Sequence, residues 1–143
     1  MKKILLTGAS GFIGQHLLPR LYKIGIVYPL TSDLTDHASV VTEVKEISPD
    51  IIIHLAARTE VQKSFYEQVS FSEVNYVGTV NLIEACRQLD NNPYFVFAST
   101  MEVYGWQPIS DEVEQTGTYA KAVVFDEHTI PNPNAPYAVA KLA

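Results

Sequence analysis

The stretch Thr7-Gly8-Ala9-Ser10-Gly11-Phe12-Ile13-Gly14 decides the fold of this 143-residue chain. A short apolar run, residues 3–6, comes directly before it and predicts a buried strand. The segment that follows, residues 11–21, has apolar side chains at helical spacing, and Gly25 lies just past its expected end. The chain therefore opens with a strand, a glycine-rich turn and a helix.

Three glycines in this turn point to a ligand with phosphate groups. The N-terminus of a helix attracts phosphate through its backbone N–H groups, and glycines let the phosphate come close to that backbone. In such a turn we expect Gly8 to permit the sharp bend, Gly11 to let phosphates approach, and Gly14 to let the helix pack on the strand. The spacing is G-x-x-G-x-x-G, and the alternative of a glycine-rich turn without a ligand is disfavoured by the strand before it and the helix after it. The stretch predicts a dinucleotide site lined by Gly8, Ser10, Gly11, Phe12, Ile13 and Gly14.

Strands and helices alternate along the rest of the chain. Further strands are predicted at residues 26–30, 51–55 and 94–98, and further helices at 37–47, at 65–89 and from Pro136 onward. The helix at 65–89 is expected to bury Val74, Val77, Val80, Leu82, Ile83 and Ala85. Such alternation predicts an α/β fold of the Rossmann type, a parallel sheet with helices on both faces.

Composition restricts the class of partner. With 47% hydrophobic and 18% charged residues the chain suits one globular domain, and a net charge of −6 argues against nucleic acid or an anionic membrane as a partner. Cys86 is the single cysteine, at helical spacing in an apolar stretch, so we expect a buried core thiol. The first apolar run is too short for a signal peptide, which makes the cytoplasm the default location. The four histidines lack metal-site spacing, and His54 is expected to be a satisfied core residue.

Four segments resemble one family, the extended short-chain dehydrogenases/reductases that include sugar-nucleotide epimerases and dehydratases. The glycine motif is similar to theirs, and three other segments match in order: His54-Leu55-Ala56-Ala57, Asn75-Tyr76-Val77-Gly78-Thr79-Val80-Asn81-Leu82, and Tyr137-Ala138-Val139-Ala140-Lys141. The resemblance covers nearly the whole chain. It implies a cofactor, NAD or NADP, held in part by Leu55, Ala56, Ala57, Tyr137 and Lys141, and a nucleotide-sugar substrate.

The last of these segments resembles the family's catalytic Y-x-x-x-K. Tyr137 and Lys141 are four residues apart and so share one helical face. A tyrosine has a pKa of about 10, and a nearby ammonium favours its ionised form, as a proton-accepting base requires. The resemblance places the third catalytic group, a hydroxyl, at Thr100, with Ser99 as the second choice. The other interpretation is a Ser-Thr pair that bonds its own backbone at a strand end.

The residues after Thr100 narrow the reaction. In the family's 4,6-dehydratases an Asp-Glu pair follows this threonine, whereas this chain has Met101-Glu102, and methionine has no proton to give. Glu102 resembles the glutamate of sugar-acid decarboxylases and is expected to act as an added acid or base, unless it is a solvated loop carboxylate. The predicted reaction is epimerisation by transient oxidation. A reductase or decarboxylase, or a non-catalytic NAD(P) sensor, are the alternatives.

The choice between NAD and NADP stays open, with NAD slightly favoured by the family. The second predicted strand ends without the acid that binds a ribose 2′-hydroxyl and without an arginine for a 2′-phosphate. Asp33 and Leu34 resemble the family's D-L-x-D, which approaches the adenine. Asp33 could equally be a plain helix cap.

Family members are longer, and this chain ends two residues after Lys141. We therefore expect one dinucleotide-binding domain over residues 1–143, the N-terminal part of a longer enzyme rather than a truncated gene product, without the C-terminal substrate lobe. The full-length form is a candidate homodimer through the helices at 65–89 and from Pro136. The loop at 106–124 has no assigned role.

Overall fold

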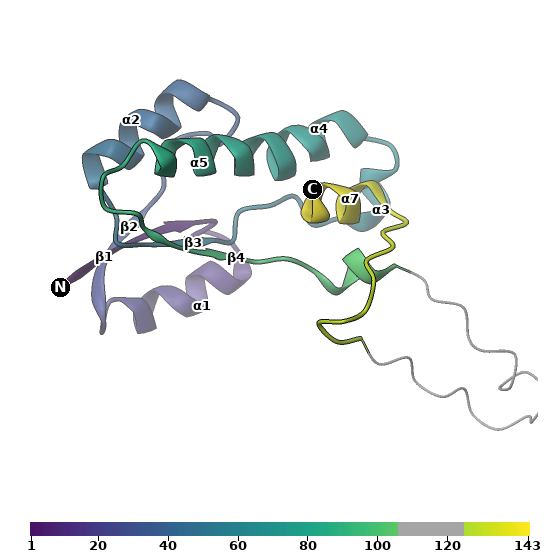
Figure 1. Ribbon diagram of the computed structural model, residues 1–143, viewed down its shortest axis with the longest axis horizontal. Coiled ribbons are helices and arrows are strands. Elements are labelled where there is room, and N and C mark those ends of the chain that lie inside the picture. Colours follow the sequence, from purple (N-terminus) through teal and green to yellow (C-terminus); the bar gives the residue numbers. More distant parts are fainter. Residues whose placement is uncertain (106–124) are drawn as a thin grey trace, which may run out of the picture.

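The computed structural model describes residues 1–105 and 125–143, which form a four-stranded parallel sheet between helices (Figure 1). In space the strands lie in the order β2-β1-β3-β4. Their bounds are Lys2–Thr7 for β1, Gly25–Pro29 for β2, Ile51–His54 for β3 and Tyr94–Phe97 for β4. The predicted α/β fold of the Rossmann type is confirmed, and each predicted strand is found to within a residue or so of its expected bounds.

Helices cover both faces of this sheet. Helix α1 (Phe12–Leu21) lies on one face, and α2 (His37–Ile47) and α5 (Gly78–Arg87) lie side by side on the other (Figure 1). The remaining helical segments are α3 (Val61–Ser64), α4 (Gln68–Ser72), the π-helical turn η1 (Glu73–Val77), the 3-10 turn η2 (Met101–Tyr104) and α7 (Pro136–Leu142). None of the helices in the described ranges is long and apolar enough to cross a membrane.

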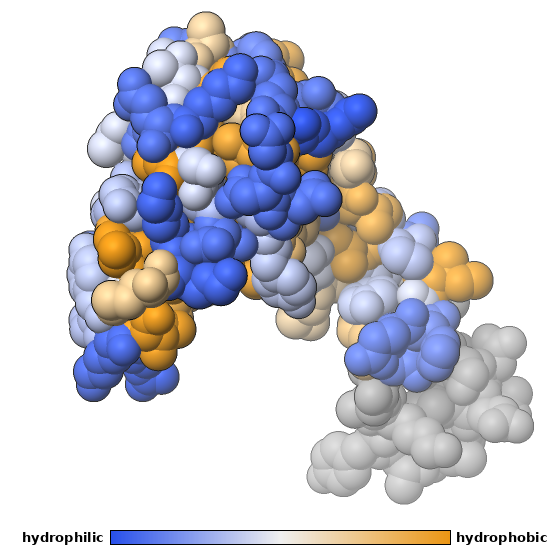
Figure 2. All heavy atoms as spheres, turned by 60° about the vertical axis from the view of Figure 1, so that its left-hand side comes forward, coloured by the Kyte–Doolittle hydropathy of each residue, from blue (hydrophilic) through white to orange (hydrophobic). Residues whose placement is uncertain are grey.

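Successive side chains of β1 point to opposite faces of the sheet, and a hydrophobic core lies on each face. Leu5 points toward α2 and α5, whereas Ile4 and Leu6 point toward α1. The first core consists of Leu5, Leu34, Val40, Val44, Ile52, Leu82 and Ala85, and the second of Ile4, Leu6, Leu21 and Val27. The face shown in Figure 2 is mostly hydrophilic, with hydrophobic residues in separate patches.

The helix predicted at 65–89 differs from the observed chain in two respects. A short helix, α3, precedes it, and the stretch from α4 to α5 contains the wider turn η1. The predicted buried face is wrong for Val77, Val80 and Ile83, which are about 40% exposed (41%, 38% and 41%). The prediction is confirmed for Leu82 and Ala85, which are buried in α5 together with Gly78 and Asn81.

The other helix predictions hold. Helix α2 has the predicted bounds, and α7 begins at Pro136 as expected. In α1, Leu17, Leu18 and Leu21 pack in the core, but Phe12 and Ile13 are exposed. The predicted loop at 106–124 lies outside the described residues.

Candidate active site

The glycine turn has the shape that the sequence predicts. Gly8 follows β1 with φ +68°, a conformation that favours glycine, and the Gly11 N–H donates to the Gly8 carbonyl (3.0 Å) to close the turn. A Cβ on Gly8 would lie 2.7 Å from the backbone nitrogen of Ala56. A Cβ on Gly14 would collide with the Gly8 carbonyl and lie 2.7 Å from Ala9 Cα. The turn therefore excludes side chains at both positions.

The first turn of α1 is suited to bind an anion. Its N-cap residue, Gly11, provides no side-chain cap, so the first N–H groups of the helix are left for another acceptor. Gly11, Phe12, Ile13 and Ser10 are exposed around this helix end. Bare backbone, uncapped N–H groups and the positive end of a ten-residue helix fit a pyrophosphate.

The turn after β3 lies against the glycine turn. Ala56 N–H donates to Thr7 Oγ1 (3.0 Å), and the register pairs Thr7 with His54. Because the Gly8 Cα faces Leu55 and Ala56, the segment Leu55–Ala57 and the glycine turn form one surface. The structure thus brings together two segments predicted to hold the cofactor.

A buried chain of hydrogen bonds fixes this junction. The Thr79 hydroxyl donates to the Asn75 carbonyl (2.6 Å), so its oxygen accepts from His54 Nε2–H (2.9 Å). In the neutral ring Nδ1 is then an acceptor, and the Thr7 hydroxyl donates to it (2.6 Å) while Thr7 Oγ1 accepts from the Ala56 N–H. Burial, together with the charge of Lys141, lowers the pKa of His54 to about 4, so the ring is neutral. His54 is a satisfied core residue, as predicted.

Asn75 joins this network from the π turn η1. Its side chain accepts from the Arg58 N–H and donates to the Arg58 carbonyl, both at 2.8 Å. It thereby holds the chain that continues from the Leu55–Ala57 turn. The sequence predicted no role for Thr7, Thr79 or Asn75; the signal that identifies them is a polar residue at a position that should be buried.

Lys141 lies next to the end of β4, and Tyr137 lies about one helical turn before it on α7. Both are buried, with 7% and 5% of their surfaces exposed. Lys141 Nζ donates to the Ala98 carbonyl (3.0 Å) and stands 4.6 Å above the centre of the Phe97 ring. Burial lowers the pKa of Lys141. The helix α7 also packs against η2, which follows Thr100.

Thr100 is half-buried at the start of η2, whereas Ser99 is exposed. Thr100 Oγ1 accepts from the Glu102 N–H (3.3 Å), so the threonine does bond its own backbone. This contact uses an oxygen lone pair and leaves the hydroxyl hydrogen for another acceptor. Both interpretations of Thr100 are therefore compatible with the geometry. Glu102 is half-buried one residue after the exposed Met101.

Asp33 and Leu34 occupy the loop before α2. The helix cap is Asp36, which accepts from the Ser39 N–H (3.2 Å), so the interpretation of Asp33 as the cap is wrong. Asp33 is exposed, and hydrogen bonds from the Thr35 N–H and hydroxyl lower the pKa of its carboxyl. The Leu34 side chain lies in the core, and its carbonyl accepts from the Asn81 side-chain amide (2.8 Å).

The remaining candidate groups are structural. Cys86 is half-buried, its thiol donates to the Leu82 carbonyl (2.9 Å), and burial raises its pKa to about 11. In the ranges that the structure describes, no three His, Cys, Asp or Glu side chains gather where they could hold a metal ion.

Residues 4–143 match the model of the NAD dependent epimerase/dehydratase family. The chain is 32% identical to dTDP-D-glucose 4,6-dehydratase of Dictyostelium discoideum, over 99% of this chain and 38% of that protein. Among solved structures it is similar to RMD from Pseudomonas aeruginosa complexed with NADPH (30% identity, TM-score 0.80, 99% of this chain and 46% of that one). It is also similar to UDP-glucose 4-epimerase of Thermus thermophilus in complex with NAD (31% identity, TM-score 0.78, 97% and 47%). The chain thus spans less than half the length of these relatives.

Proposed function

Because this chain belongs to the NAD-dependent epimerase/dehydratase family, we propose that it forms the dinucleotide-binding part of an enzyme that epimerises a nucleotide-activated sugar. One observation supports this most: the glycine turn, the Leu55–Ala57 turn and the Tyr137–Lys141 pair all follow or border the carboxyl ends of parallel strands. Ligands of open α/β sheets bind at this edge. The bound NAD(P) would supply hydride chemistry, oxidation of a sugar carbon and its reduction from the opposite face.

The residues of this chain would divide the remaining tasks. The uncapped N–H groups of α1 would bind the pyrophosphate, and Asp33 would approach the adenine. Tyr137 would accept the proton of the sugar hydroxyl, and Thr100 would hydrogen-bond the same hydroxyl. The Lys141 ammonium, held at the end of β4 by the Ala98 carbonyl, would stabilise the ionised tyrosine.

The residues after Thr100 favour this reaction over dehydration. Elimination of water requires an acid and a base beside the sugar, and Met101 can act as neither. Glu102 would serve as an added acid or base. An epimerase returns its cofactor to the starting state, so turnover would leave the NAD(P)H absorbance unchanged.

The test is turnover of a panel of nucleotide-sugars by the full-length protein. We expect Tyr137→Phe to lose at least about 100-fold in turnover, as for loss of a general base, while it still binds NADH. The matched control is Tyr22→Phe, at an exposed tyrosine beyond the far end of α1, which should retain full activity. Turnover by Tyr137→Phe at the wild-type rate would refute the role of the tyrosine, and a wild type that binds NADH but turns over no sugar would favour a sensor.

A further inference from the structure

The end of β2 lies beside the start of the glycine turn. The Leu30 N–H donates to the Leu6 carbonyl (2.9 Å), which extends the pairing of β2 with β1 by one residue. Thr31 and Ser32 therefore follow next to the point where Thr7 leads into Gly8. In dinucleotide-binding folds the residue after this strand meets the ribose that is attached to the pyrophosphate.

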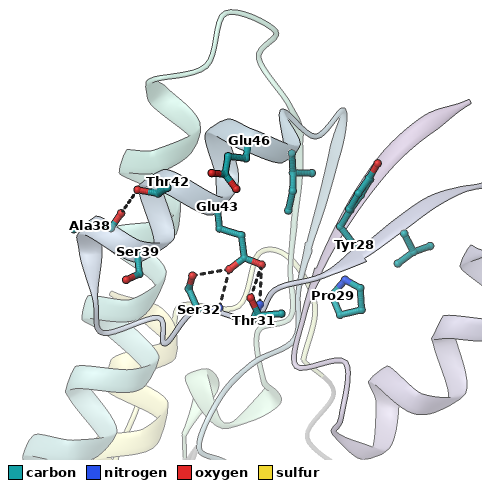
Figure 3. Close-up of a pocket in the computed structure, with 11 residues that line it drawn as sticks. Tyr28, Pro29, Thr31, Ser32, Ala38, Ser39, Thr42, Glu43 and Glu46 are labelled. Atoms are coloured by element: carbon teal, nitrogen blue, oxygen red, sulfur yellow. Dashed lines mark hydrogen bonds between the residues drawn. The ribbon is translucent and has the colours of Figure 1, made fainter.

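A carboxylate from another element reaches this strand end. Glu43 of α2 accepts four hydrogen bonds there (Figure 3). Its Oε1 accepts from the Thr31 N–H (2.9 Å) and hydroxyl (3.0 Å), and its Oε2 accepts from the Ser32 N–H (2.8 Å) and hydroxyl (2.5 Å). The strand end thus has an acid, although the sequence of β2 contains none.

This cluster borders an open pocket of about 730 Å³ between β2 and α2. Partial burial would raise the pKa of the Glu43 carboxyl, but the hydrogen bonds from Ser32 and Thr31 outweigh it and hold that pKa below its usual value. The carboxyl is therefore ionised at neutral pH.

The hydrogen-bond directions determine what the cluster can bind. Both hydroxyls and both N–H groups donate to Glu43, so Thr31 and Ser32 present only oxygen lone pairs to an approaching group. A ribose 2′-hydroxyl can donate to such an oxygen. A 2′-phosphate is negatively charged and needs hydrogen-bond donors. Here it would meet the oxygen lone pairs of Thr31 and Ser32, with the Glu43 carboxylate behind them, and would be repelled.

We propose that Glu43 is a positioning residue that sets cofactor specificity, because it orients Thr31 and Ser32 to accept the 2′-hydroxyl of NAD and to repel the 2′-phosphate of NADP. The inference rests on the proposed dinucleotide site. It answers the question that the sequence leaves open, since the acid comes from α2 and not from β2.

The test is fluorescence titration of the full-length protein with NADH and with NADPH. We expect the wild type to bind NADH at least about tenfold more tightly than NADPH, a difference of about 1.4 kcal/mol. Glu43→Gln removes the charge and should shrink this ratio about fivefold or more through tighter NADPH binding, which a loss of folding could not produce. Glu46→Gln is the matched control: Glu46 lines the same pocket on the same helix, yet the bonds described for Thr31 and Ser32 all go to Glu43.

A second variant keeps the inference testable should Glu43→Gln fail to fold. Ser32→Arg places a cation at the proposed ribose contact and should increase NADPH affinity about tenfold or more. Equal binding of the two cofactors by the wild type, or an unchanged ratio in a folded Glu43→Gln, would overturn this inference and leave the proposed function intact. If Glu43→Gln does not fold, the absence of a gain in Ser32→Arg would overturn it. Failure of the wild type to bind either cofactor would overturn both.

Discussion

His54 should make the folding stability of this protein depend on pH above the range where carboxylates titrate. The ring is fully buried and neutral, with both nitrogens hydrogen-bonded, and its pKa falls from 6.5 to about 4. The unfolded chain binds a proton below pH 6.5 and the folded one does not. Stability is therefore full above pH 6.5 and falls as the pH drops toward 4, by about 3 kcal/mol in total and about 2 kcal/mol by pH 5.

Urea denaturation followed by circular dichroism at pH 7.5 and pH 5 measures this loss. His54→Gln removes the titrating group, so its free energy of unfolding should be lower at pH 7.5 but nearly constant between the two values. His16→Gln, at an exposed histidine of α1, should keep the wild-type pH dependence. If the wild type were equally stable at both pH values, or if His54→Gln lost stability as steeply, the argument from burial would be refuted.

Three further predictions concern the glycine turn, the core and the thiol. Gly14→Ala should lower the melting temperature, with a loss of about 1–3 kcal/mol in folding stability, and should also lower NADH affinity, since its Cβ has no room. Gly11→Ala should weaken only NADH binding, because its Cβ would be 3.2 Å from the nearest backbone oxygen. Asn81→Ala removes a buried bond to the Leu34 carbonyl (2.8 Å) and should cost about 1–3 kcal/mol in urea denaturation. Cys86 should react with iodoacetamide at pH 8 about 100-fold more slowly than an ordinary thiol, and fast labelling would contradict its raised pKa.

The sequence predicts those features that depend on short-range rules. The turn requires a positive φ at Gly8 and leaves no room for a side chain at Gly14, where the backbone of residues 8 and 9 is too close. Glycine satisfies both requirements, so its fixed spacing in the sequence predicts the turn. The observed bounds of α2 agree with the prediction: Asp36 caps its first turn, and Ser48, with φ 46°, ends it. Buried strands are recognisable because parallel strands covered on both faces are continuous apolar runs.

Features that depend on packing between distant segments are not predictable in this way. Asn75 of the π turn η1 is hydrogen-bonded to Arg58, seventeen residues earlier, a contact that no local pattern indicates. The acid at the end of β2 comes from Glu43, eleven residues after Ser32, and becomes visible only once α2 packs on the sheet. The alternative that made Asp33 the cap of α2 fails for a local reason, since Asp33 and Asp36 are both suitable cap residues and only the observed backbone shows which one is used.

The register of the sheet connects the two halves of the candidate site. Thr7, His54 and Phe97 occupy one level across β1, β3 and β4. Thr7 donates to His54, the His54 ring lies 5.7 Å from the Phe97 ring, and Lys141 Nζ stands over that same ring. A continuous row of buried contacts thus runs from the residue before Gly8 to the lysine that would stabilise the base. Because each member is held by its neighbour, a change at His54 should disturb cofactor binding and the position of Lys141 together, although His54 itself would touch neither cofactor nor sugar.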